Sequence, residues 1–323
     1  MVRNSSPRIT ITAALLLAAF LVTPVAWAAN GSHWGPNYFP NVPLTTQDGT
    51  TVHFYDDLIK GKIVVIDLIY THCKDMCPLE TARLAQVQRL LGDRVGKDIF
   101  FYSISIDPKA DTASVLKSYA DKYHAGPGWL FLTGKKTDIE LLGKKLGVFT
   151  EREQTRDGHT PSVLIGNEKT GQWMKDGATD NPQFMASIIR NYMGEWKDRK
   201  PEAQKDYSEV AEIKITHKGQ YLFATRCSAC HTIGHGDKIG PDLLEATARR
   251  NRAWLARFIA TPDKVLEEKD PIATAMFQKY KQIQMPNLKV SPEDVGYLID
   301  YLETQNKGIA NPSQPGTSGY DHR

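Results

Sequence analysis

Short apolar runs alternate with stretches of helical period over much of the chain. Residues 63–70 (IVVIDLIY) form a nearly continuous apolar run rich in β-branched side chains, which is typical of a strand covered on both faces. Leu84, Val87 and Leu91 then recur at the spacing of a helix. Further strands are expected over 99–106, 129–132, 162–165 and 172–174, and further helices over 112–123, 138–146 and 182–192. The pattern predicts an α/β layered domain over residues 35–193.

A different pattern follows a charged break. Residues 194–212 (GEWKDRKPEAQKDYSEVAE) carry many charges and few apolar side chains, so we expect a linker there. From 213 to 305 the apolar spacing is helical only, which predicts an all-α domain. Its clearest helical stretches are 218–229, 252–260 and 292–303. The tail, 306–323, is rich in Pro, Gly and Ser and is expected to be disordered.

Composition and charge restrict the class of protein. A chain of 323 residues with 41% hydrophobic residues has enough apolar material for about two folded domains. The formal net charge is only +3, and the basic residues form no long block. We therefore expect no nucleic-acid partner.

The N-terminus has the order of a secretory signal. Two arginines precede an apolar run over 11–22, and small residues follow at Ala26 and Ala28. We therefore expect a signal peptide over 1–28 and a location in the periplasm. The alternative is an uncleaved segment that associates with the membrane, although the run is short of the roughly 20 apolar residues that span a bilayer.

Four cysteines occur as two close pairs, Cys73 with Cys77 and Cys227 with Cys230. A structural disulfide that closes so short a loop adds little stability through chain entropy. Each pair is therefore expected to have a chemical role.

The second pair stands in the string CSACH, which ends at His231. This spacing allows two thiols to add to the vinyl groups of a haem while the histidine ligates its iron. A redox disulfide and a zinc site are the alternatives, but His217 and His235 nearby do not complete a usual zinc pattern. The motif predicts one covalently attached haem c.

The whole of 213–305 resembles small monohaem cytochromes c. The resemblance is carried by Gly219 and Phe223 before CSACH, Tyr301 and Leu302 on the last helical stretch, and Gly240 with Pro241 in IGPDL. It implies that the first helix packs on the last, and that a backbone carbonyl of the IGPDL loop orients the proximal histidine.

The same resemblance implies a distal axial ligand, Met285 in the string MPNL. Met276 is the competing thioether, but it lies on an expected helix without such a loop. Methionine ligation raises the potential of the iron and favours electron transfer.

Cys73 and Cys77 (THCKDMCP) lie where the apolar strand gives way to a helix. The positive end of a helix lowers the pKa of a thiol, so we expect at least one of them to be partly ionised at neutral pH. Two soft thiolates select copper, and His159 is the candidate imidazole for a three-ligand site. The alternative is a catalytic disulfide without metal.

Residues 35–193 resemble the Sco/SenC family of thioredoxin-like copper proteins. The matching positions are Tyr70, Thr71, Cys73, Asp75, Cys77 and Pro78, then SISIDPKADT over 103–112, and DGHTPSVLI around His159. The resemblance implies a thioredoxin-like fold and a copper site made by Cys73, Cys77 and His159. It also implies copper delivery to the copper-centre subunit of a cytochrome oxidase.

Three functions remain open from the sequence. The chain is a copper metallochaperone, a thiol–disulfide oxidoreductase that uses Cys73 and Cys77, or an electron-transfer protein whose main centre is the haem. Its partner is the oxidase subunit or another periplasmic redox protein. Because a haem is fused to a redox-capable site, we expect electrons to pass between the two.

Overall fold

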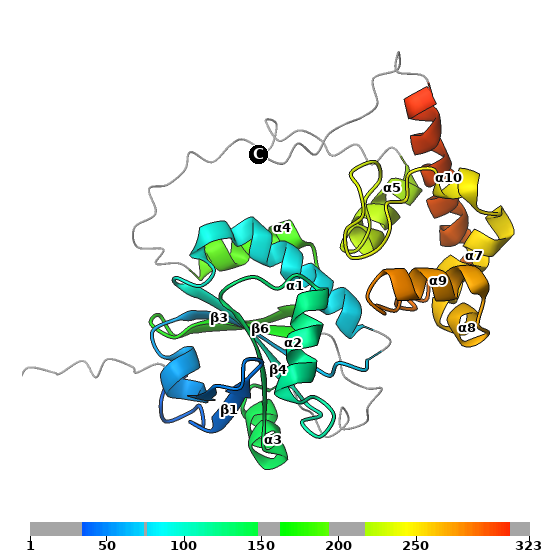
Figure 1. Cartoon of the computed structure of the whole chain (residues 1–323). Helices are drawn as coiled ribbons and strands as arrows, with labels where there is room; N and C mark the ends of the chain where they lie inside the picture. Colours follow the sequence, from blue (N-terminus) through cyan, green and yellow to red (C-terminus); the bar gives the residue numbers. More distant parts are fainter. Residues whose placement is uncertain (1–33, 74–75, 148–161, 194–216, 311–323) are drawn as a thin grey trace, which may run out of the picture. The chain divides into compact units, whose positions relative to one another are not determined.

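The computed structural model describes residues 34–73, 76–147, 162–193 and 217–310. The expected signal peptide (1–28), the whole of the expected linker (194–212) and His159 lie outside these residues. The described residues fall into an α/β part up to residue 193 and a helical part from residue 217 (Figure 1).

Seven strands form one sheet among the described residues of the first part, in the order β2-β1-β5-β4-β3-β6-β7. They are β1 (Pro43–Thr46), β2 (Thr51–His53), β3 (Ile63–Ile69), β4 (Ile99–Ser105), β5 (Trp129–Gly134), β6 (Ser162–Asn167) and β7 (Gln172–Gly177). The central strands β3, β4 and β5 are parallel, and the outer ones pair antiparallel. The parallel centre brings the ends of β3 and β4 to the same edge.

Helices cover both faces of this sheet (Figure 1). They are α1 (Cys77–Leu91), α2 (Ala113–Lys122), α3 (Lys136–Lys145) and α4 (Pro182–Ser187), with a 3-10 turn over Gly92–Arg94 and π-helical turns over Phe54–Ile59 and Ile188–Tyr192. Apolar side chains of α1, α2 and α4 pack on one face, and those of α3 and the Phe54–Ile59 turn pack on the other.

Strand β3 lies inside the sheet and is covered on both faces. All seven of its residues are buried. Val65 and Ile69 belong to the core on one face, while Val64, Ile66 and Leu68 belong to the core on the other. Each such aliphatic side chain contributes about 1.5–3 kcal/mol when fully buried. The predicted two-faced strand is thereby confirmed.

The described residues 217–310 contain helices and no strand. The helices are α5 (Lys218–Leu222), which continues as a π-helical turn over Phe223–Cys227, α6 (Ala246–Arg249), α7 (Arg252–Ala260), α8 (Pro262–Glu267), α9 (Pro271–Lys279) and α10 (Pro292–Ala310). Prolines begin α8, α9 and α10, where a missing N–H costs nothing. The side chains of Asn251 and Asp270 cap α7 and α9 by accepting two backbone N–H groups each.

Helix α10 corrects one sequence boundary. The tail was expected from residue 306, but α10 ends at Ala310. The physical reason is that no proline interrupts the helix before Pro312.

In the part of the chain that the structure describes, no helix is both long and apolar enough to cross a bilayer.

Candidate haem and metal centres

The first cysteine pair lies at the carboxyl end of β3. Cys73 follows the strand in a short loop, where its backbone N–H donates to the carbonyl of Tyr70 over 3.1 Å. Cys77 is the first residue of α1. Cys73 is partly exposed and Cys77 is fully buried. The sequence expectation that both lie where strand meets helix is confirmed.

The electrostatics of the pair correct part of the thiolate prediction. A hydrogen bond with Cys73, together with burial, raises the pKa of the Cys77 thiol despite its place at a helix N-terminus. In the absence of a metal Cys77 is therefore a neutral thiol at pH 7. The helix dipole is outweighed because the low-dielectric surroundings and the neighbouring sulfur both disfavour a second charge.

A buried aspartate fixes the loop that carries Cys73. The carboxylate of Asp111 accepts hydrogen bonds from the backbone N–H of Thr71 over 3.1 Å and from its hydroxyl over 2.5 Å. It also accepts one from the hydroxyl of Ser105 over 2.6 Å, and its side chain is fully buried. The segment SISIDPKADT therefore serves the cysteine loop directly. In the sequence this segment contributed only to the family resemblance, and Asp111 had no predicted role.

Glu80 is a second buried acidic residue to which the sequence alone gave no role. Glu80 lies on the inner face of α1 with no exposed surface, and neither carboxylate oxygen has a hydrogen-bond partner among the described residues. Burial raises the pKa of Glu80 well above its ordinary value, and the neighbouring charges of Asp67 and Cys73 add to this. Asp67 accepts a hydrogen bond from Ser103 over 2.6 Å. The Glu80 carboxyl near Cys73 therefore keeps its proton to a higher pH than an exposed glutamate does.

The third expected copper ligand lies beyond what the structure describes. Among the described residues, no group of three or more His, Cys, Asp and Glu side chains is placed to hold a metal. His159 as a ligand stays a prediction. Two other histidines have different roles, since His72 lies 3.6 Å from the carboxylate of Asp107 and His217 accepts the N–H of Gly219 at the start of α5.

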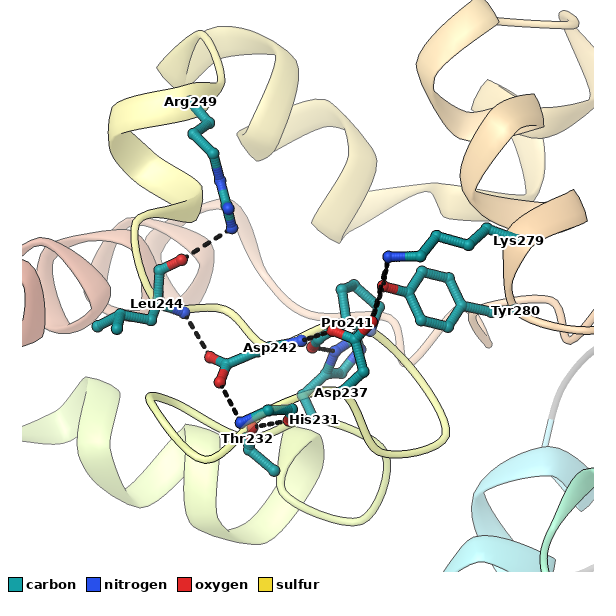
Figure 2. Close-up of polar contacts among 10 residues, drawn as sticks. His231, Thr232, Asp237, Pro241, Asp242, Leu244, Arg249, Lys279 and Tyr280 are labelled. Carbon is teal, nitrogen blue, oxygen red and sulfur yellow. Dashed lines mark hydrogen bonds and ion pairs between the residues drawn. The ribbon is translucent and has the colours of Figure 1, made fainter.

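The CSACH motif forms a tight turn at the end of the first helix of the second part. The backbone N–H groups of Cys230 and His231 both donate to the carbonyl of Cys227, over 3.1 and 3.0 Å. Nδ1 of His231 lies 2.9 Å from the carbonyl oxygen of Pro241, so it must carry the proton (Figure 2). Nε2 is left to bind iron. The carbonyl expected from the IGPDL loop is thereby identified as that of Pro241.

Two glycines allow close contacts around this motif. A Cβ atom at Gly240 would lie 2.7 Å from the His231 ring, and one at Gly219 would lie 2.0 Å from the carbonyl oxygen of Tyr297. The rings of Phe223 and Tyr301 are 6.1 Å apart. The predicted packing of the first helix on the last, α5 on α10, is confirmed.

An apolar crevice adjoins the imidazole of His231. Its lining from the helical part includes Ile239, Phe258, Leu266, Ala273, Met276, Phe277, Ile283 and Met285. Burial lowers the pKa of His231, while the hydrogen bond to Pro241 acts in the opposite direction. The imidazole is therefore neutral at pH 7, which is the form that ligates a metal. A crevice of this chemistry beside two cysteines and a histidine fits a covalently bound haem.

Both candidate thioethers line the crevice. Met276 lies on α9, and Met285 lies in the loop between α9 and α10, as expected. Since both are present, the choice of Met285 as distal ligand stays a prediction.

Known proteins resemble the two parts separately. A model of the SCO1/SenC family matches residues 37–194, and a model of the cytochrome c family matches residues 216–306. An SCO2-like protein of Rickettsia typhi is 30% identical over 145 residues, which are 43% of this chain and 70% of that protein. The SCO1 protein homolog of Bacillus subtilis is 34% identical over 31% of this chain and 51% of its own length.

Three further SCO2-like proteins from Rickettsia species match over 69%, 61% and 53% of their lengths. Among solved structures, Bradyrhizobium japonicum ScoI with copper bound is 26% identical over 47% of this chain and 98% of that chain, with a TM-score of 0.39.

Proposed function

Because this chain belongs to the SCO1/SenC family and carries a haem c domain behind that region, we propose that it binds copper and supplies the copper centre of a cytochrome oxidase. The observation that carries the proposal is the pair of sulfurs at the end of β3, within hydrogen-bonding distance of each other. Two soft ligands this close suit Cu(I) over hard cations.

The unequal exposure of the two cysteines suits transfer of the metal. Cys77 is buried and Cys73 is partly exposed, so an incoming client ligand reaches the copper from the Cys73 side. His159 supplies the third ligand in this proposal. A three-ligand site is open enough for exchange with a client, whereas a closed four-ligand site holds its metal.

The proposal places the protein in the periplasm, exported by the signal at residues 1–28. If that segment is retained, the protein is associated with the membrane. The partner is the copper-centre subunit of the oxidase, with another periplasmic redox protein as the alternative.

Copper transfer by ligand exchange does not need a haem, so the haem is expected to accept or donate electrons. Oxidation of bound Cu(I) to Cu(II) releases one electron, which is what one haem iron accepts. Oxidation of the dithiol to a disulfide releases two electrons and two protons, and one haem iron accepts one electron at a time. Another periplasmic redox protein must therefore reoxidise the haem between the two steps. We propose that electrons pass between the first domain and the haem.

A maturation assay tests the copper function. A strain without this protein is complemented with the wild type, with C73S/C77S, or with C227S/C230S, and the copper content of the purified oxidase is measured. The wild type should restore the oxidase copper, and C73S/C77S should not. C227S/C230S distinguishes the role of the haem from that of the copper site. If the haem serves only redox cycling, this variant still delivers some copper to the oxidase. Full delivery by C73S/C77S would contradict the proposal.

Rapid mixing tests the electron exchange. Protein with oxidised haem is mixed with Cu(I), and haem reduction is followed in the visible spectrum. Internal transfer predicts a first-order rate that does not change with protein concentration and is lost in C73S. A haem that stays oxidised, or that is reduced equally in C73S, would rule internal transfer out.

The same pair supports thiol–disulfide exchange as a second function. An accessible Cys73 suits attack on a client disulfide, and the buried Cys77 beside it suits release of the mixed disulfide. Copper-free protein should then reduce a client disulfide, and C77S should trap the mixed disulfide. If copper-free protein leaves the client oxidised, this second function is excluded.

A further inference from the structure

One carboxylate connects the two loops that face the haem crevice. Oδ1 of Asp237 accepts the backbone N–H of Asp242 over 3.0 Å. Its Oδ2 accepts the hydroxyl of Tyr280 over 2.9 Å and the ammonium of Lys279 over 3.1 Å (Figure 2). We call Asp237, Lys279 and Tyr280 together the Asp237 clasp. It joins the loop after CSACH to the end of α9.

On the proximal side, the clasp holds the histidine. Asp242 directly follows Pro241, whose carbonyl accepts the hydrogen bond from His231. The side chain of Asp242 accepts three backbone N–H groups, from Gly234, Gly236 and Leu244, over 2.8, 2.6 and 2.8 Å. The loop is therefore one hydrogen-bonded unit, so a shift of Asp237 is transmitted to the imidazole.

On the distal side, the clasp holds the start of the Met285 loop. The N–H of Tyr280 donates to the carbonyl of Met276 over 3.0 Å, and its carbonyl accepts the N–H of Ile283 over 3.0 Å. Lys281 and Gln282 between them have positive φ values of 55° and 58°, which mark a tight turn. Only Gln284 separates this turn from Met285. Holding Tyr280 in place therefore holds the start of the loop that carries Met285.

We propose that the Asp237 clasp is a positioning device that controls how easily the distal methionine leaves the haem iron. It rests on the haem c site and on Met285 as the distal ligand. Release of Met285 requires the loop after Tyr280 to move away from the crevice, and the clasp opposes that movement. The hydrogen bonds from Asp242, Tyr280 and Lys279 keep the pKa of Asp237 below its ordinary value, so the acceptor is charged at neutral pH.

Displacement by imidazole tests the proposal on the full-length, haem-loaded protein. Imidazole replaces a weakly held methionine, and the loss of the thioether-to-iron absorption band gives its apparent Kd. We expect D237N and Y280F to bind imidazole about 3 to 10 times more tightly than the wild type, which is the effect of losing one hydrogen bond from the closed state. Y280F keeps the ring and removes only the hydroxyl, so it guards against misfolding of D237N.

The matched control is E268Q. It removes another exposed ion pair of the same domain, between Glu268 and Arg257, that touches neither loop. E268Q should bind imidazole like the wild type. A clasp that only stabilises the fold would lower the melting temperature of D237N and leave the imidazole affinity unchanged, and that result would overturn the proposal. If Met276→Ala rather than Met285→Ala abolishes the band, the ligand assignment is wrong and the proposal fails with it. With Met285 confirmed as the ligand, unchanged imidazole affinity in D237N and Y280F overturns the clasp alone.

Discussion

Cys73 and Cys77 are four residues apart in sequence and lie in different surroundings. Cys73 reaches the surface from a loop held by Asp111, whereas Cys77 is buried at the first turn of α1. Copper lowers the cost of ionising the buried thiol, because a bound cation stabilises the thiolate that the hydrogen bond with Cys73 and burial disfavour. Metal binding is therefore coupled to proton release at this pair.

Substitution of Met285 tests the predicted axial ligand of the haem iron. Met285→Ala should remove the thioether-to-iron absorption band and lower the reduction potential of the haem, because a neutral soft ligand favours the reduced iron. Met276→Ala, in the same crevice, should keep the band and change the potential little. An optical redox titration of both variants measures this. A band that survives in Met285→Ala and disappears in Met276→Ala would reverse the assignment.

Glu80 gives a prediction about pH. The folded state raises the pKa of Glu80, so between its ordinary value of 4.5 and the raised value the folded chain binds a proton that the unfolded chain has lost. Stability contributed at this site therefore falls as the pH rises above about 4.5. Glu80→Gln cannot ionise, so it should be more stable than the wild type at pH 8, by on the order of 1 kcal/mol, and should gain less at pH 5.

Urea unfolding at the two pH values measures this difference. Glu140→Gln is the control, because Glu140 lies on the surface of α3 with an ion pair to Lys136. It should show no such pH-dependent gain. A Glu80→Gln variant with the same stability difference at pH 5 and pH 8 would show that Glu80 does not titrate as described.

At the scale of elements, the strongest sequence patterns placed β3, β4, α2 and α7 to within one or two residues. The pattern gave no separate bounds to β1 and β2, since strands of four and three residues have too few positions for a period of two. The helices α6 and α8 are also only four and six residues long. The helices expected over 182–192 and 218–229 both continue as π-helical turns, which no side-chain spacing announces.

The site residues divide in the same way. Motifs of fixed local spacing identified both cysteine pairs and His231. Asp111 was missed because its partner Thr71 lies 40 residues away and meets it only through the parallel pairing of β3 with β4. The Asp237 clasp was missed because Asp237 is 42 and 43 residues from Lys279 and Tyr280 and meets them only in the folded domain.

The contact of α5 with α10 gives a prediction at this scale. Gly219→Ala should destabilise the haem domain by about 1–3 kcal/mol, because the new Cβ would lie 2.0 Å from the carbonyl oxygen of Tyr297. Gly296→Ala makes the same chemical change on α10, where a Cβ has nothing within 4 Å. It should stabilise the domain by up to about 1 kcal/mol. Thermal melting followed by the haem spectrum compares them, and equal effects of the two substitutions would contradict the packing described.

At the scale of the whole molecule, two chemistries are joined in one chain. The first domain offers paired sulfurs, and the second offers a haem held by CSACH and an imidazole oriented by Pro241. The sequence predicts a charged linker over 194–212, and a linker of that length would raise the effective concentration of one site near the other. The proposed electron exchange uses this covalent connection.

The copper content of the haem-loaded protein tests whether Cys73 and Cys77 bind copper. Full-length protein is incubated with Cu(I), separated from excess metal, and analysed for copper and haem together. We predict about one copper per haem in the wild type, almost none in C73S/C77S, and weaker retention against a chelator in His159→Ala, with His53→Ala as the surface control. The haem spectrum should be the same in all four proteins. Equal copper retention by the wild type and C73S/C77S would contradict copper binding by this cysteine pair.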